Sequence, residues 1–146
     1  MNRNEPGMQE QVWQRVFAQP EPRQESLGPL IMAAQEQTAS LRQLAGSLAS
    51  GREEAARLYQ ESWNTVLTLV GLERLRGANA EALKPGPQSR EPARRLLEKS
   101  YRRAKQAVTE YTARSLDGEC GMVFQHLARR AETHCVIIAQ LLGMLP

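Results

Sequence analysis

Mostly apolar side chains recur at helical spacing along this chain from residue 28 onward. Three stripes can be read from the sequence, each returning every three or four residues as the core-facing side of an α-helix does. Their members are Ile31, Ala34, Thr38, Leu41, Ala45 and Leu48; Leu97, Tyr101, Ala104, Val108, Tyr111 and Ser115; and Phe124, Leu127, Ala131, His134, Ile138 and Leu142. We therefore expect helices over these stretches.

Turn residues mark where the first two helices begin and end. Gly28-Pro29 opens the first helix, because proline is tolerated at the first helical position, and we expect this helix to end near residues 47–51. Ser50-Gly-Arg-Glu53 has the form of a capping box, in which two side chains satisfy free N–H groups of the first turn. The sequence therefore predicts a second helix over about residues 52–76, which Gly77 ends.

A long connection separates the first two helices from the last two. Residues 77–92 contain several Pro and Gly residues and have no helical periodicity, so we expect a crossover there. A third helix is predicted over about residues 92–116, and Asp117-Gly118 ends it and supplies a cap for the fourth. Short links within each pair and one long link between pairs predict an all-α four-helix bundle over residues 26–146.

Residues 1–25 differ from the rest of the chain. They are rich in Gln, Glu and Pro, and we expect them to form a loose N-terminal arm. One apolar group interrupts the arm at helical spacing: Val12, Trp13, Val16 and Phe17. Because leaving a large apolar side chain in water costs about 1.5–3 kcal/mol, we expect Trp13 and Phe17 to cover one end or side of the bundle.

The two helix pairs repeat each other at an offset of 70 residues. The aligned pairs are Leu27 with Leu97, Ile31 with Tyr101, Ala34 with Ala104, Thr38 with Val108, Leu41 with Tyr111, Val66 with Val136, Leu67 with Ile137 and Leu72 with Leu142. We therefore expect two helical hairpins built on one plan and related by a pseudo-twofold axis. The same offset pairs Glu61 with Ala131 and Asn64 with His134. The first half therefore has the Glu of a Glu-x-x-His motif, and the second half has the His.

Two segments carry a resemblance to a known superfamily. They are Tyr111-Thr-Ala-Arg-Ser and Phe124-Gln-His-Leu-Ala-Arg-Arg-Ala-Glu-Thr-His134. Over roughly residues 27–143 the chain resembles the rubrerythrin-like branch of the ferritin-like superfamily. That resemblance implies a bundle with a di-iron site, to which two helices give one Glu each and the other two a Glu-x-x-His each.

Most of the ligand positions that the resemblance implies hold other residues. In chain order, the six positions hold Ala34, Glu61, Asn64, Ala104, Ala131 and His134. Only Glu61 and His134 match the ligand types. Because an unpaired buried carboxylate is costly, alanine at three of these positions is what a metal-free core favours. The resemblance thus implies a degenerate di-iron site.

Glu61 and His134 admit three interpretations. We favour a structural role, either as a buried or half-buried hydrogen-bonded pair or as two polar residues satisfied by Asn64, Tyr101 or Tyr111. A vestigial mononuclear metal site is the second, although two protein ligands leave many positions to water. Acid–base catalysis is the third.

Composition narrows the class of protein. An aromatic content of 5% and the dominance of Ala, Leu, Gln, Glu and Arg favour an all-α fold. The 146 residues can bury a core without disulfides, and Cys120 and Cys135 fall about 22 Å apart on one helix, too far to bond. The chain has no signal-peptide pattern and no apolar run of about 20 residues, so we expect a cytoplasmic protein without membrane contact.

The charge pattern and the remaining reactive side chains indicate no further functional site. The net charge of +3 includes a basic concentration at Arg94, Arg95, Lys99, Arg102, Arg103 and Lys105. We interpret it as a solvated helix face rather than a site for nucleic acid or another polyanion. His126 lies beside the packing stripe and is expected at the surface, while apolar neighbours favour an inert, packed Cys135.

Three functional hypotheses follow. The leading one is a non-enzymatic ferritin-like bundle without cofactors, which acts as a structural or interaction module and associates, as a possible homo-oligomer, through a helix face. The alternative is a rubrerythrin-like di-iron oxidoreductase or iron-handling protein that recruits off-stripe acids such as Glu36, Glu110 or Glu132. A basic helical protein that binds a polyanion is the third.

Overall fold

The computed structural model describes residues 26–78, 80, 88–116, 118 and 120–146. Within these ranges the chain forms four α-helices and no β-strand. The helices are α2 (Gly28–Ser47), α3 (Arg52–Leu75), α4 (Ala93–Ser115) and α5 (Gly121–Gly143). The predicted all-α four-helix bundle is confirmed. The expectation that Trp13 and Phe17 cover the bundle lies outside the described residues.

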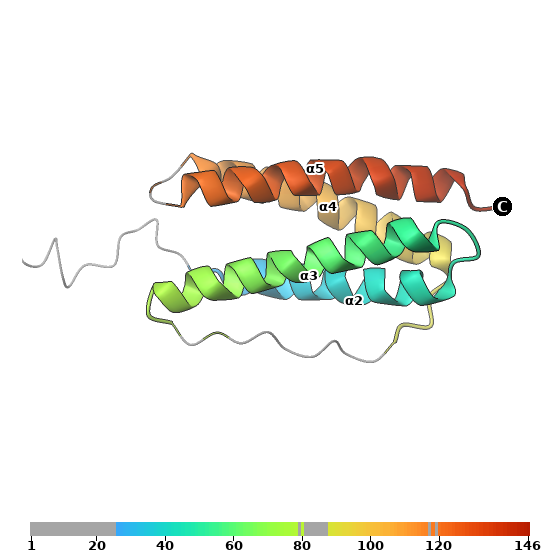
Figure 1. The fold of residues 1–146 in the computed structure, drawn as a ribbon, viewed down its shortest axis with the longest axis horizontal. Helices are drawn as coiled ribbons and strands as arrows, with labels where there is room; N and C mark the ends of the chain where they lie inside the picture. Colours follow the sequence, from blue (N-terminus) through green and yellow to red (C-terminus); the bar gives the residue numbers. More distant parts are fainter. Residues whose placement is uncertain (1–25, 79, 81–87, 117, 119) are drawn as a thin grey trace, which may run out of the picture.

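Two antiparallel hairpins make up the bundle, α2 with α3 and α4 with α5 (Figure 1). The hairpins meet chiefly along α2 and α4, whereas α3 and α5 approach each other little. Helix α3 ends and α4 begins at opposite ends of the bundle (Figure 1). The chain therefore has to return along the whole bundle between these helices, as the expected crossover requires.

The turn between α2 and α3 depends on a glycine. Gly51 is the N-cap of α3 and has a φ of 81°, a left-handed conformation that residues with a Cβ adopt only at a cost. No side-chain hydrogen bond caps this helix, so the capping box predicted at Ser50–Glu53 is wrong. The left-handed Gly51 makes the sharp reversal, and Glu53 in the first turn instead complements the positive end of the helix dipole.

A carboxylate from α3 caps the start of α2. The buried Glu73 accepts hydrogen bonds from the backbone N–H of Leu27 at 2.6 Å and from the Ser26 hydroxyl at 3.0 Å. A negative group at a helix N-terminus satisfies free N–H groups and interacts favourably with the dipole. Glu73 therefore ties the end of α3 to the beginning of α2.

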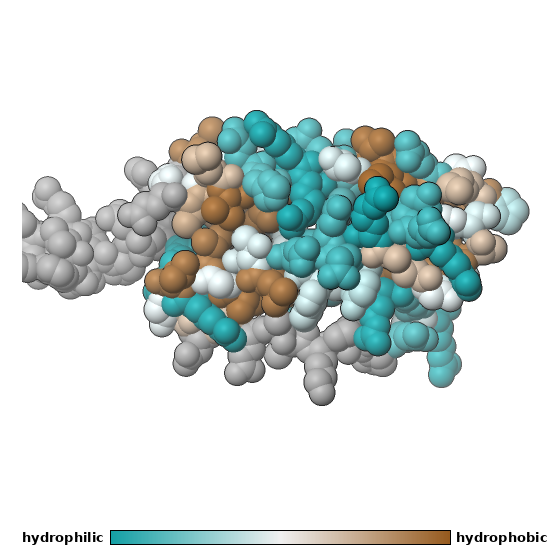
Figure 2. Space-filling view, viewed as in Figure 1, coloured by the Kyte–Doolittle hydropathy of each residue, from teal (hydrophilic) through white to brown (hydrophobic). Residues whose placement is uncertain are grey.

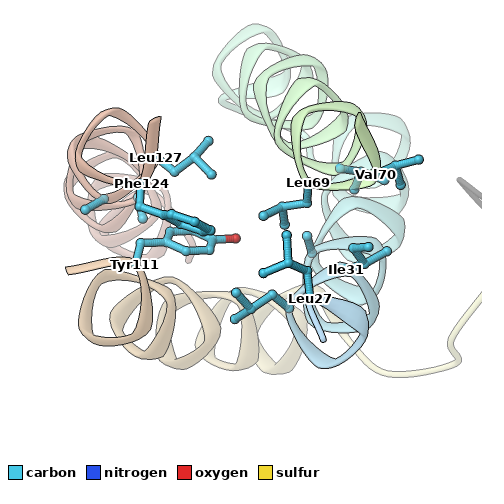
Figure 3. Close-up of a cluster of buried hydrophobic side chains, with 12 residues drawn as sticks. Leu27, Ile31, Leu69, Val70, Tyr111, Phe124 and Leu127 are labelled. Atoms are coloured by element: carbon cyan, nitrogen blue, oxygen red, sulfur yellow. The ribbon is translucent and has the colours of Figure 1, made fainter. Parts of the chain in front are cut away.

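Two hydrophobic clusters fill the bundle, one toward each end. The first cluster comprises Leu27, Leu30, Ile31, Ala34, Val66, Leu69, Val70, Tyr111, Phe124, Leu127, Ala128 and Ala131. The second comprises Leu41, Leu44, Leu48, Ala55, Leu58, Leu96, Leu97, Ala104, Cys135, Ile138 and Leu141. In the first cluster, Tyr111, Phe124 and Leu127 face Leu27 and Leu69 across the space between the hairpins (Figure 3). Each cluster thus joins both hairpins.

The repeat at an offset of 70 fails for α3 and α5. Asn64 is exposed whereas His134 is 5% exposed, and Val66 is fully buried whereas Val136 is 58% exposed. The buried positions of these two helices match better at an offset of 69, which aligns Thr65 with His134. In α2 and α4, by contrast, Ala34 and Ala104 are both buried. The prediction that Asn64 and His134 lie at equal depth is therefore wrong.

Apolar side chains also lie on the surface. Figure 2 shows them gathered over the C-terminal half of α3 and the neighbouring start of α5. Leu67, Leu75 and Met122 in this region are 47%, 85% and 83% exposed. None of the four described helices combines the length and hydrophobicity that crossing a bilayer would require.

Candidate functional site

Buried polar residues form a layer between the two hydrophobic clusters. This polar layer consists of Gln37, Thr38, Ser62, Thr65, Ser100 and His134. In α2, α3 and α5 its members lie where the first cluster gives way to the second, so the layer crosses the middle of the bundle. Of the ligand positions selected from the sequence, His134 belongs to this layer and Glu61 precedes Ser62 in it, whereas Asn64 is exposed.

The three alanines at implied ligand positions face inward. Ala34, Ala104 and Ala131 are 7%, 4% and 7% exposed. Their stripes therefore point where the sequence predicted. At each of these places a methyl group stands where the resemblance implies a carboxylate, so these three positions supply none of the negative charge that two metal ions would need.

Glu61 and His134 meet across the gap between α3 and α5. The Nε2 atom of His134 lies 2.8 Å from Oε1 of Glu61, and the Glu61 side chain is 36% exposed. The structure thus brings together the two residues selected from the sequence. They form the half-buried hydrogen-bonded pair that we favoured. Neither Tyr101 nor Tyr111 is hydrogen-bonded to this pair, and Asn64 is exposed to solvent.

His134 is held in its neutral form. Burial lowers its pKa because the imidazolium is poorly solvated there, and the Arg130 charge acts in the same direction, against the opposing effect of Glu61. A carboxylate can only accept a hydrogen bond, so Nε2 of the neutral ring carries the proton and donates to Glu61. This assignment makes the pair a structural contact between a neutral imidazole and a carboxylate.

Arg130 is the residue of this site that sequence reasoning missed. It donates through Nη1 to the Thr65 hydroxyl at 2.9 Å and to the Glu61 carbonyl oxygen at 3.3 Å. Its Nη2 atom lies 3.1 Å from Nε2 of His126, which is exposed as predicted. A signal was present in the sequence, because residues 126, 130 and 134 are spaced by four and share one face of α5.

The hydrogen bonding of the polar layer is incomplete. The Thr38 hydroxyl lies 2.7 Å from both the Ala34 carbonyl oxygen and the Ser62 hydroxyl, so this part is satisfied. The Gln37 side-chain amide donates to the Ser100 carbonyl oxygen at 2.9 Å. Oε1 of Gln37 and Oγ of Ser100 have no partner among the described residues. Such unsatisfied buried groups are uncommon in folded proteins.

A cavity of about 110 Å³ lies beside the polar layer and contacts all four helices. Its wall includes the three inward alanines together with Gln37, Arg130 and His134. The residues of its wall that are exposed, Ala33 and Gln106, lie on α2 and α4. The cavity therefore opens between these two helices.

The donor set does not fit a di-iron centre. No group of three or more His, Cys, Asp and Glu side chains with metal-binding geometry occurs in the described part of the chain. Glu61 and His134 form a pair without a third such group. Cys135, next in sequence, packs in the second cluster, and burial raises the pKa of its thiol as its apolar neighbours led us to expect.

The basic concentration on α4 is partly neutralised. Glu91 accepts from Lys99 at 2.6 Å and lies 3.8 Å from Arg95, and the Lys99 hydrogen bond holds the pKa of Glu91 below its ordinary value. Arg103 lies 3.6 Å from Glu36 and donates to the Ser40 hydroxyl. These contacts agree with a solvated face more than with a continuous polyanion-binding surface.

Comparisons with known proteins give no relative. No protein-family model matches the chain, and no curated protein or solved structure matches it significantly. The resemblance to rubrerythrin-like proteins therefore stays a prediction from sequence.

Proposed function

We propose that this protein is a non-enzymatic ferritin-like bundle that has lost its di-iron centre and works by association. The observation that carries the proposal is the burial of Ala34, Ala104 and Ala131 around the central cavity. A dinuclear cluster needs about four carboxylates from the surrounding helices, and these positions provide none. The two remaining candidate ligands, Glu61 and His134, are hydrogen-bonded to each other.

The neutral state of His134 supports the same proposal. Its Nε2 proton has to leave before that nitrogen can bind a metal, and the hydrogen bond to Glu61 would be lost. Two protein ligands would then hold the ion, with water in every other position. Such a site binds weakly compared with closed four-ligand sites.

An iron-binding oxidoreductase or iron-handling protein is the alternative. The 2.8 Å contact between Glu61 and His134 favours it, because two ligands of one ion lie about this far apart. Glu110 also contributes to the cavity wall and could be recruited. The alternative then requires an acid from α4 to join a pair held by α3 and α5.

Iron loading separates the two functions. The full chain is incubated with excess ferrous iron in air and desalted, and the iron per chain and the rate of ferrous oxidation are measured. We expect far less than one iron per chain and no oxidation above the buffer rate. A Glu61→Gln/His134→Gln variant is the control, since it should behave as the parent does. Two irons per chain, about 3.5–4 Å apart, would establish the alternative instead.

The association surface of this proposal is a face of α3. The residues Trp63, Leu67, Gly71 and Leu75 are spaced by four, and Leu67 and Leu75 are exposed in the apolar region of Figure 2. Apolar patches on a protein surface mark contact sites for other molecules. A second copy of this chain is the partner that we propose.

Sedimentation equilibrium of the full chain tests this face. We expect a dimer that the Leu67→Lys/Leu75→Lys variant converts to a monomer, because a charge cannot be desolvated in the contact without a large cost. Val136→Lys is the matched control: Val136 is 58% exposed on α5, and its replacement should leave the dimer intact. A parent protein that stays monomeric at all concentrations contradicts the proposal.

A further inference from the structure

The central cavity is small, and much of its wall is apolar. Its volume is about 110 Å³, and the methyl groups of Ala34, Ala104 and Ala131 contribute to the wall. In another protein an apolar cavity of about 150 Å³ holds benzene, so this cavity suits a smaller molecule, of roughly four to five non-hydrogen atoms. Any ligand is therefore compact, with a short apolar part.

Arg130 brings a positive charge without a counter-charge to the cavity wall. Its guanidinium group is hydrogen-bonded to the Thr65 hydroxyl, the Glu61 carbonyl oxygen and the His126 ring. The Glu61 carboxylate is bonded to His134 instead, and Arg130 forms no ion pair within the described part of the chain. A half-buried cation is costly until an anion compensates it. An anionic ligand would remove that cost.

The guanidinium group also has hydrogen-bond donors to spare. Both Nη1 protons are used, on Thr65 and on the Glu61 carbonyl oxygen. One Nη2 proton is directed to His126, which has to accept because arginine only donates. The Nε proton and the second Nη2 proton have no partner among the described residues. Two such donors suit a carboxylate, which accepts parallel bonds from one guanidinium group.

Tyr111 supplies a further donor. Its hydroxyl points into the space between the hairpins (Figure 3) and forms no hydrogen bond with the described residues. Burial and the nearby Glu110 raise the pKa of Tyr111 to about 12, against the opposing effect of the Arg130 charge. The hydroxyl therefore stays protonated at neutral pH and is able to donate to an anion that Arg130 binds.

The other ionisable groups of the wall are neutral or have partners. Arg103 lies 3.6 Å from Glu36, and Glu110 accepts a hydrogen bond from Gln106 at 3.1 Å. His134 is neutral, chiefly because of its burial. Two guanidinium groups and one carboxylate leave the described wall with one positive charge in excess. A monoanion neutralises that excess, whereas a dianion would bring more charge than the wall compensates.

We propose that the cavity binds a small aliphatic monocarboxylate, whose carboxylate group accepts hydrogen bonds from Arg130 and from the Tyr111 hydroxyl. The short hydrocarbon part then lies against the three alanine methyl groups. The inference rests on the proposed function, because the cavity is free for such a ligand only when no metal cluster occupies the bundle centre. Propionate represents this class, with one charged end and a short apolar tail.

Titration of the metal-free full chain with propionate and with propionamide tests the proposal. Propionamide has the same shape without the charge, and sodium chloride at equal concentration controls for ionic strength. Nuclear magnetic resonance of the alanine methyl groups follows binding at the cavity wall. We expect propionate to bind about tenfold more tightly or better, since a hydrogen bond to a charged group contributes about 1.5–3 kcal/mol and 1.4 kcal/mol is tenfold in affinity.

Variants of the two donors assign the site. Arg130→Met should lower the affinity for propionate to that for propionamide. Arg129→Met removes a guanidinium group from the next, exposed position of α5 and should leave the affinity unchanged. Tyr111→Phe should weaken propionate binding about fivefold, the effect of one hydrogen bond of about 1 kcal/mol.

Filling the cavity gives the second arm. Ala131→Leu should abolish propionate binding, and Ala34→Leu serves if that variant does not fold. Ala139→Leu makes the same chemical change at an exposed position of α5 and should keep the parent affinity. Circular dichroism establishes that each variant is folded before titration.

The outcomes distinguish this proposal from the proposed function. A protein that binds neither iron nor propionate overturns the ligand alone, whereas two irons per chain overturn the proposed function as well. Propionate binding that survives in the folded Ala131→Leu variant would place the anion outside the cavity and contradict the proposal. Equal affinities for propionate and propionamide in the parent would show that Arg130 does not bind the ligand.

Discussion

The two hydrophobic clusters and the polar layer between them are stabilised by different interactions. In the clusters, side chains such as Leu58 and Leu69 are fully buried and contribute only dispersion and the hydrophobic effect. In the polar layer, residues of similar burial depend on hydrogen bonds, and Gln37 and Ser100 each have an atom without a partner in the described part of the chain. The clusters stabilise the bundle by burying apolar surface, whereas each unsatisfied buried atom of the layer costs free energy.

The largest difference is expected between Leu58 and Ser62, which lie one turn apart on α3. Leu58→Ala leaves a hole in the second cluster and should lower the free energy of unfolding by about 2–5 kcal/mol. Ser62→Ala removes one hydrogen bond to Thr38, which keeps the Ala34 carbonyl, and should cost about 1 kcal/mol. Urea unfolding measures both. Equal costs would show that the layer is as important for stability as the clusters.

Exchanging a methyl for a hydroxyl sharpens the comparison. Val66 is fully buried in the first cluster, so Val66→Thr should cost about 1–3 kcal/mol for the new polar group. The opposite exchange, Thr38→Val in the polar layer, should cost about 1 kcal/mol, because the Ala34 carbonyl oxygen keeps its backbone bond within α2 and the Ser62 hydroxyl loses one partner. Thermal unfolding of the two variants gives the order. If Thr38→Val lowers stability more than Val66→Thr does, the hydrogen bonds of the polar layer contribute more to stability than we expect.

A variant of Arg130 tests the hydrogen bonds that this α5 residue makes to α3. Arg130→Met keeps the apolar stem but removes the bonds to Thr65 and Glu61, and it should lower stability by about 1 kcal/mol. Arg129→Met is the matched control, since Arg129 is exposed on the next position of the same helix. Its effect should lie within about 0.5 kcal/mol of zero. Indistinguishable variants in urea unfolding would mean that the bridge contributes nothing.

The smallest effect concerns pH. The pKa of His134 is lowered in the folded protein, chiefly by burial, so the unfolded chain binds the proton more readily. Stability from this group is therefore complete above the ordinary histidine pKa of about 6.5 and is lost as the pH falls below it, toward the lower folded pKa. The melting temperature between pH 7.5 and 5 measures the loss.

Histidine variants assign that pH effect. His134→Gln should flatten the dependence, whereas His126→Gln, at the exposed histidine of the same helix, should keep it. A dependence that disappears only in the His126 variant would assign the titration to the surface.

The helices and their inward faces could be predicted from the sequence. The bounds of α2 and α3 and the burial of Ala34, Ala104 and Ala131 follow the 3.6-residue period, which fixes the face that each helix turns to the core. Glu61 and His134 were selected from the resemblance to rubrerythrin-like proteins, and their side chains do meet. Their metal-binding role stays a prediction.

The contacts between helices could not be predicted in this way. The period within one helix says nothing about how far its neighbour is rotated or shifted along the axis. For that reason Asn64 was expected inside and lies outside, and the buried stripe of α5 is one residue out of step with that of α3. The reach of Arg130 to Thr65 and the capping of α2 by Glu73 depend on the same relative placement.

By itself the sequence determined four amphipathic helices, the long return between the pairs and the presence of alanine at three inward positions. These are local properties, because propensity, turn residues and periodicity act within about a dozen neighbouring residues. Only the tertiary structure decided which polar groups share the middle of the bundle, that Oε1 of Gln37 finds no partner among the described residues, and that a cavity remains beside the polar layer. Those depend on distances between segments far apart in the chain, which packing of the whole bundle sets.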